Sequence, residues 1–146
     1  MAADGARPSA SEAASPLEVC AGLVFREGSL LITQRPAGSH LGGLWEFPGG
    51  KQHADESDRD CLMRELNEEL GIEVAVGRLV ETITHAYPER LVRLKFFQCR
   101  WLRHEPQALG CQQFAWIGPA SLGGYAFPDA DARLLERLAT ENELWR

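Results

Sequence analysis

The sequence predicts an α/β fold, an α/β/α sandwich in which helices pack on both faces of a mixed β-sheet. Apolar runs of strand length alternate along the chain with segments of helical character. Strands flanking helices in this order are typical of a sheet that is covered on both sides. No stretch repeats, and a chain of 146 residues suits one domain. At that size a domain buries roughly two thirds of its unfolded surface.

The first two strands are expected at residues 19–25 and 30–33, both of which are mostly apolar. Residues 26–29 between them read Arg-Glu-Gly-Ser, which is turn chemistry, so the two runs predict a hairpin. Residues 36–50 contain five glycines and predict a loop. Because Leu44, Trp45 and Phe47 keep this loop apolar, we expect it to fold over another part of the molecule.

A helix is expected at residues 57–70, and Gly71 stands where a C-capping glycine would end it. Three strands are expected to follow, at residues 74–84, 91–102 and 114–117. Residues 128–138 predict a terminal helix, because Leu134, Leu135 and Leu138 recur at helical spacing.

The bulk properties exclude several classes of protein. A formal net charge of -6 argues against sequence-independent binding to a nucleic-acid polymer, which needs a positive surface. It does not exclude a nucleotide, which bound cations and a few local basic side chains can hold. No apolar stretch is long enough to span a bilayer, so no membrane partner is expected.

The cysteines and the N-terminal residues indicate where the protein resides. The four cysteines form no C-x-x-C pair and are expected to be reduced, buried thiols. Residues 1–16 lack the apolar core of a signal peptide and predict a disordered tail ahead of a single domain at 17–146. Together these features predict a cytoplasmic protein.

The most informative segment is the helix expected from residue 57. At about 100° per residue, Glu65, Glu68 and Glu69 fall within an arc of about 100°, beside a stripe of leucines. Two such charges about 4 Å apart repel by around 4 kcal/mol at an effective dielectric constant of 20. A bound divalent cation removes that cost, and Mg²⁺ with oxygen ligands is the natural candidate. The alternative is a solvated acidic face without a ligand.

The full spacing decides between these alternatives. The spacing resembles the Nudix box at every defined position. Five residues separate Gly50 from Glu56, and seven more separate Glu56 from residues 64–72, which read Arg-Glu-Leu-Asn-Glu-Glu-Leu-Gly-Ile. Residues 34–36 (Gln-Arg-Pro) and 44–51 (Leu-Trp-Glu-Phe-Pro-Gly-Gly-Lys) look like the MutT type of Nudix hydrolase. The similarity runs from about residue 17 to the last helix. It implies the Nudix fold and hydrolysis of a nucleoside triphosphate to a monophosphate and pyrophosphate.

The resemblance also implies roles for matching residues. Mg²⁺, with Mn²⁺ as a substitute, would be held by Glu65, Glu68, Glu69 and the backbone carbonyl of Gly49. Glu65 is the candidate general base. Glu65 and Arg64 form the expected catalytic group, Arg64 by holding the carboxylates in place. The expected structural residues are Gly50, Glu56 and Gly71. Arg35 and Lys51 are expected near the substrate phosphates.

One departure from the family pattern concerns the loop before the last strand. Many MutT-type proteins carry a further glutamate there, whereas residues 109–113 read Leu-Gly-Cys-Gln-Gln. Glu105 lies nearby but out of register, and whether it replaces the missing carboxylate stays open. The missing glutamate strengthens the case for Glu65 as the base.

Base recognition is expected near the C-terminus, where residues 127–131 resemble the segment that meets the nucleobase in MutT-type enzymes. Asp131 stands where the guanine-selective type has Asn, and an ionised Asp only accepts hydrogen bonds. It would favour a base edge with N–H donors, or it would simply cap the last helix. Tyr87 is expected to stack on the base and Phe127 to line the same pocket, although either could be a core residue.

The resemblance predicts an enzyme that removes oxidised nucleotides such as 8-oxo-dGTP. A CTP or 5-methyl-(d)CTP pyrophosphohydrolase is the alternative, supported by Asp131. A nucleotide-binding Nudix module without catalysis is the third, but such a module should have lost box glutamates. Either a monomer or a homodimer fits the sequence.

Overall fold

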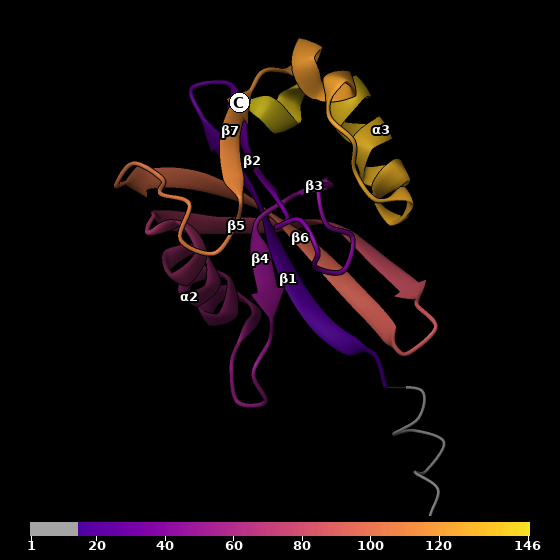
Figure 1. Cartoon of the computed structure of the whole chain (residues 1–146). Coiled ribbons are helices and arrows are strands. Elements are labelled where there is room, and N and C mark those ends of the chain that lie inside the picture. The colour runs from indigo at the N-terminus through magenta and orange to yellow at the C-terminus, as the bar shows by residue number, and fades with distance from the viewer. Residues whose placement is uncertain (1–14) are drawn as a thin grey trace, which may run out of the picture.

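A twisted seven-stranded mixed sheet forms the centre of the molecule in the computed structural model (Figure 1). The structure describes residues 15–146, so most of the expected N-terminal tail at residues 1–16 lies outside the described residues. The strand order is β3-β2-β1-β6-β5, with β4 paired to β1 and β7 paired to β2. The β1–β6 pair is parallel and the other pairs are antiparallel, which confirms the expected mixed sheet.

The expected hairpin is formed by β1 (Leu17–Arg26) and β2 (Ser29–Gln34). Glu27 and Gly28 turn the chain between them with φ values of 48° and 82°. Gly28 adopts the left-handed conformation without steric cost, which is why turn chemistry identified this position correctly.

The expected loop at residues 36–50 contains two short strands that the sequence did not predict. They are β3 (Trp45–Glu46), which pairs with β2, and β4 (Gly49–Lys51), which pairs with β1. The space against β1 is so tight that a Cβ on Gly49 would stand 2.0 Å from the carbonyl oxygen of Cys20. The glycines that suggested a loop are therefore needed partly for close strand packing.

The helix α2 (Asp58–Leu70) follows β4 and begins and ends where the sequence predicts. The Ser57 hydroxyl accepts a hydrogen bond from the Asp60 amide at the N-cap, and Gly71 ends the helix with φ 70°. Leu62, Leu66 and Leu70 are fully buried on one face. Helix α2 packs against β1, β4 and β5, and so fixes its other face beside the Gly49–Lys51 strand.

Long antiparallel strands β5 (Glu73–Ala86) and β6 (Leu91–Arg103) lie on the other side of β1, and β7 (Gln113–Ile117) pairs with β2. The C-terminal part consists of the 3₁₀ turns η1 (Pro119–Gly124) and η2 (Asp129–Asp131), helix α3 (Ala132–Thr140) and η3 (Asn142–Trp145). The predicted terminal helix is thus correct, although its first three residues form a 3₁₀ turn. Neither η1 nor η3 was predicted.

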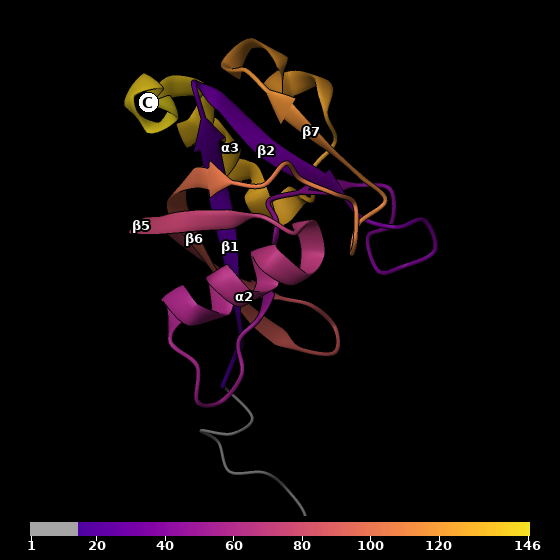
Figure 2. The same cartoon turned by 90° about the vertical axis from the view of Figure 1, so that its left-hand side faces the viewer.

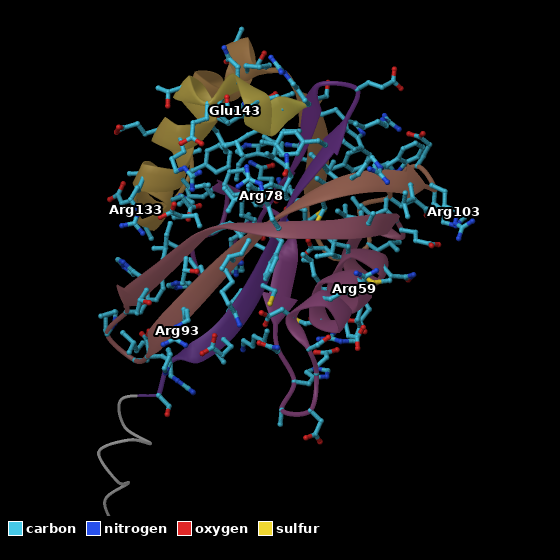
Figure 3. All side chains as sticks on the ribbon, turned by 180° about the vertical axis from the view of Figure 1, so that it is seen from behind. Arg59, Arg78, Arg93, Arg103, Arg133 and Glu143 are labelled. Carbon is cyan, nitrogen blue, oxygen red and sulfur yellow. The ribbon has the colours of Figure 1, made fainter. Side chains whose placement is uncertain are left out.

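Helices α2 and α3 lie on opposite faces of the sheet, as Figure 2 shows, and each covers its own hydrophobic core. Leu134 and Leu138 of α3 pack in one core, while the leucines of α2 pack in the other. From behind, Arg133 on α3 and Arg59 on α2 appear on opposite sides of β5 (Figure 3). This arrangement confirms the expected α/β/α sandwich.

Two further expectations can be compared with the described residues. Within residues 15–146, no helix combines the length and the apolar character needed to cross a bilayer. All four cysteines are free thiols; three of them are buried and Cys111 is half-buried. The expected reduced thiols are therefore present.

Candidate active site

Arg64 is the centre of a network that joins α2 to the preceding loop. Its Nε and Nη2 atoms donate to the two carboxylate oxygens of Glu56 at 2.5 and 2.9 Å, and Nη2 also donates to the Lys51 carbonyl at 3.1 Å. Its Nη1 donates to Glu65 at 2.9 Å and to Glu68 at 3.2 Å. The hydrogen bonds from Arg64 lower the pKa of Glu56 to about 2. One planar guanidinium thus fixes three acidic side chains.

The Glu65 side chain lies against the backbone of β4. A Cβ atom on Gly50 would be 2.3 Å from the Glu65 carboxylate, so only glycine leaves room for it. The carboxylate is 20% exposed and is held by Arg64 on one side. The short β4 strand and the guanidinium together fix the position of this side chain.

Glu69, one turn after Glu65, carries the most perturbed carboxylate of the helix. Burial, followed by the nearby charges of Glu46 and Glu65, raises the pKa of Glu69 to about 8. Its Oε1 atom is buried and has no hydrogen-bond partner among the described residues. A buried acceptor without a donor is costly, so this oxygen is suited to a ligand that the protein itself does not supply.

Backbone groups of residues 107–110 hold the end of α2 next to this oxygen. The amides of Leu109 and Gly110 donate to the Glu69 carbonyl at 3.1 and 3.0 Å, and the Gln107 amide donates to the Leu70 carbonyl at 2.9 Å. These bonds satisfy carbonyls that a helix end otherwise leaves free. The segment in which the sequence lacks a glutamate therefore serves as a cap on the glutamate helix.

A cavity of about 670 Å³ opens beside Glu69 and extends to the C-terminal part of the chain. Gly49, Gly50, Lys51 and Glu69 line one end. The rest of its charged and polar lining comes from Arg35, His40, Glu46, Tyr87, Glu89, Arg90 and Asp131. The remaining wall is apolar and is formed by side chains of β1 and β6 together with Leu41, Phe47 and Pro128. One cavity thus joins the acidic end of α2 to the segment that precedes α3.

The same segments carry the sequence similarity to known proteins. A family model described as the NUDIX domain matches residues 20–137. The chain belongs to the Nudix hydrolase family. This confirms the resemblance read from the glutamate spacing, and it makes the protein an enzyme of the phosphoric-anhydride hydrolase class.

Relatives with assigned names fall into two groups. The CTP pyrophosphohydrolase of Escherichia coli (strain K12) is 41% identical over 120 residues, which cover 82% of this chain and 89% of that protein. The 8-oxo-dGTP diphosphatase of Haemophilus influenzae is 34% identical over 126 residues, which cover 86% of this chain and 93% of that protein.

Solved structures give the same family. One structure, from a comparison of MutT from Aliivibrio salmonicida with MutT from Vibrio cholerae, matches with a TM-score of 0.70 and 30% identity. The match covers 87% of this chain and 99% of that chain. The MutT protein from Methanosarcina mazei Go1 has a TM-score of 0.78 at 24% identity, covers 89% of this chain and 98% of that chain, and supports the fold alone. Together they confirm the expected Nudix fold.

Nudix hydrolases need a divalent metal ion, and the residues at the acidic end of the cavity fit one. The unpartnered oxygen of Glu69 and the nearby Glu65 offer the oxygen ligands that hard cations prefer. Within residues 15–146, however, no three His, Cys, Asp or Glu side chains are already arranged around one point. Arg64 holds Glu65 and Glu68 instead, so a metal would compete with the guanidinium for them.

Of the other residues predicted for the site, some line the cavity and some do not. Lys51 and Tyr87 line the cavity, as expected. Glu68 is 61% exposed and lies outside the cavity lining. Arg64 also lies outside the lining and contacts carboxylates, so the contacts of Arg64 are those of a positioning residue. Phe127, expected to line the pocket, lies behind it: its ring stacks on Phe47 with 5.1 Å between centroids.

Arg35 lines the cavity but is not a free cation. Its Nε donates to the His40 carbonyl at 2.6 Å and its Nη1 donates to Glu46 at 3.1 Å. Glu46 is the main site residue that sequence reasoning missed, together with His40 and Arg90. The only sequence signal for Glu46 was its place in the Leu-Trp-Glu-Phe-Pro-Gly-Gly stretch, in which only the glycine carbonyl was assigned a role.

Asp131 lines the cavity and is only 6% exposed. It stands at the N-cap position of α3, but its side chain makes no capping hydrogen bond. The alternative reading of Asp131 as a helix cap is therefore wrong. Burial, and then the charge of Glu46, raises the pKa of Asp131 to about 6.

The open question about Glu105 has a structural answer. Glu105 is 73% exposed and pairs with Arg26 at 2.8 Å, at the end of β1 remote from the Gly49–Lys51 strand. The guanidinium of Arg26 lies over the rings of Trp101 and Trp116, which fixes the pair there. Glu105 therefore does not replace the missing loop carboxylate.

Proposed function

We propose that this Nudix hydrolase cleaves nucleoside or deoxynucleoside triphosphates to the monophosphate and pyrophosphate, with Mg²⁺ and with Mn²⁺ as a substitute. The observation that carries the proposal is the single cavity between Glu69 and Asp131. A triphosphate needs charge neutralisation at one end, and a nucleobase needs an enclosed polar edge at the other. This cavity offers both.

At the phosphate end, the residues of the chain supply alignment and a proton acceptor. Glu65 has a fixed carboxylate beside β4 and takes a proton from the attacking water. Glu69, Glu68 and the carbonyl of Gly49 would hold the metal together with Glu65, and the metal would supply neutralisation of phosphate charge and a more acidic water. Lys51 has an exposed ammonium group at the same end, where it contacts phosphate oxygens.

The proposed reaction breaks an internal phosphoanhydride bond. Water attacks an internal phosphorus, the bond between that phosphorus and the bridging oxygen breaks, and pyrophosphate leaves with the electron pair. Arg35 orients Glu46, and its guanidinium keeps N–H donors beyond those that bind Glu46 and the His40 carbonyl, which are available to phosphate oxygens. Arg90, at the cavity edge, is a second basic group near the substrate.

At the base end, Asp131 reads the hydrogen-bonding edge of the base and Tyr87 contacts its face. Our first choice of substrate is an oxidised nucleotide such as 8-oxo-dGTP, as in the relative from Haemophilus influenzae. The alternative is CTP or 5-methyl-(d)CTP, favoured by Asp131 and by the 41% identical relative from Escherichia coli. Both reactions fit a monomer or a homodimer that acts on the cytoplasmic nucleotide pool.

A substrate panel tests the proposal. kcat/KM is measured with Mg²⁺ on dGTP, 8-oxo-dGTP, CTP, dCTP and 5-methyl-dCTP, and pyrophosphate and orthophosphate are quantified separately. We expect pyrophosphate as the only phosphate product. Tight binding of these nucleotides without turnover of any of them would instead support a non-catalytic Nudix module.

A further inference from the structure

Asp131 is a buried polar residue of this cavity with no partner among residues 15–146. Its relative exposure is 6%, and no described residue donates a hydrogen bond to its carboxyl group or forms an ion pair with it. A buried polar group without a partner costs free energy. The structure therefore leaves this carboxyl group either to bind a ligand donor or to hold a proton.

The charged groups around Asp131 do not favour its ionised form. Glu46 of β3 faces it with a like charge, and Tyr87, between β5 and β6, faces it with a phenol. Arg35, just after β2, lines the same cavity but already binds Glu46 and the His40 carbonyl. Of the other titratable groups on neighbouring elements, Asp129 is exposed and Glu81 pairs with Arg133 and Arg137. His85 is half-buried with its ring against Tyr87, and Glu89 and Arg90 are exposed residues that line the cavity. Burial and Glu46 raise the pKa of Asp131 to about 6.

The two protonation states of Asp131 match different base edges. A neutral carboxyl group offers one O–H donor and one acceptor oxygen, whereas a carboxylate offers two acceptors. The cytosine edge presents an N4 amino donor beside the N3 acceptor, which fits the neutral form. The guanine edge presents the N1–H and N2 amino donors side by side, which fits the carboxylate. 8-Oxoguanine offers both patterns, with N7–H beside O6 on one edge and N1–H beside N2 on the other.

We infer that the proton on Asp131 selects the base: the neutral form of the site takes cytosine nucleotides and the ionised form takes guanine nucleotides. This inference rests on the proposed function, since it concerns the base end of the same cavity. It adds a neutral form of Asp131, which can donate one hydrogen bond, to the ionised form that the sequence predicts. The base preference of the pocket then depends on pH and is not fixed.

The consequence is quantitative. If only the neutral form binds cytosine and only the ionised form binds guanine, the ratio of kcat/KM for dCTP to that for dGTP is proportional to proton activity. It then falls about tenfold for each unit of pH increase. Effects of pH on steps that are common to both substrates cancel in the ratio. The ratio of dCTP to 8-oxo-dGTP should change less, because 8-oxoguanine fits either form.

The experiment measures this ratio from about pH 6 to about pH 8 in the unaltered protein, in Asp131→Asn and in Asp129→Asn. Asp129 is the matched control, since it lies in the same 3₁₀ turn but is exposed. We expect the unaltered protein and Asp129→Asn to show the fall, and Asp131→Asn to show a ratio that is independent of pH. A flat ratio in the unaltered protein, or an unchanged slope in Asp131→Asn, would overturn the inference.

A binding measurement separates this inference from the proposed function. Affinities for CMP and GMP are measured by calorimetry on the unaltered protein without metal over the same pH range. The CMP-to-GMP affinity ratio should fall as pH rises, whether or not any triphosphate is hydrolysed. A pH-independent ratio would overturn the inference even if hydrolysis occurs, while absent hydrolysis with a pH-dependent ratio would contradict only the proposed function.

Discussion

The carboxylate of Glu65 occupies the space beside Gly50 that a side chain at position 50 would need. A Cβ atom there would lie 2.3 Å from the carboxylate carbon and from one of its oxygens. The spacing between these two residues, which identifies the family in the sequence, is thus a packing relationship in the structure. It holds the proposed general base against β4, next to Gly50, which lines the cavity.

Replacing Gly50 by alanine should displace the Glu65 carboxylate while leaving the fold intact, because the group in the way is the end of a flexible side chain. A displacement of about 1 Å at a catalytic group can cost about 100-fold in rate. We expect a fall in kcat of about that size with an unchanged circular dichroism spectrum. Gly123→Ala, where a Cβ would meet nothing within 4 Å, is the control and should retain full activity.

Arg64→Lys should be far from conservative. A lysine ammonium cannot bind both oxygens of Glu56 and also reach Glu65 and the Lys51 carbonyl. We expect a loss of about 1–2 kcal/mol in the free energy of unfolding by urea, together with a lower kcat. Arg59→Lys on the same helix has an exposed side chain and should change neither quantity. Equal behaviour of the two variants would show that the network is not needed.

Glu65→Gln keeps the shape of the side chain but removes its ability to take a proton. We expect kcat to fall by about 10²–10⁴-fold, which is the typical contribution of a positioned general base. Thermal unfolding should stay close to that of the unaltered protein, because Arg64 keeps its two bonds to Glu56. Glu136→Gln, on the exposed face of α3, is the control. A Glu65→Gln variant that is as active as the parent would rule out Glu65 as the base.

Asp131 should make stability depend on pH. Burial raises its pKa from 3.8 to about 6, so the folded state holds a proton more tightly than the unfolded state does. Its contribution to stability is therefore fully present below about pH 4 and is lost as pH rises through about 6. Asp131→Asn should be more stable than the parent by up to about 3 kcal/mol at pH 8 and little different at pH 4. Urea unfolding at both pH values checks this, with Asp129→Asn as the unaffected control.

Local sequence signals predicted the bounds of α2 and its buried face correctly. The Ser57 cap, the Gly71 stop and the leucine period of α2 are local properties, and each is found where it was predicted. The pairing of Arg64 with Glu68 also follows from helical spacing alone. In this part of the chain, local geometry determines which side chains meet.

Contacts between distant segments were not predictable in the same way. Glu46 matters because β3 carries it between Glu69 and Asp131, which are 62 positions apart along the chain. Arg35 was predicted near the phosphates, but its contact with Glu46 could not be predicted from spacing. Phe127 was expected in the cavity, but a stack with Phe47 places it one layer behind. Each of these outcomes depends on tertiary packing rather than on spacing.

The most direct test of the central claim is the product pattern from dCTP and 8-oxo-dGTP in the presence of Mg²⁺, compared between the unaltered protein and Glu65→Gln. We expect stoichiometric nucleoside monophosphate and pyrophosphate from the unaltered protein, and a rate reduced by at least about 100-fold in the variant. Release of orthophosphate, or equal rates for the two proteins, would contradict it.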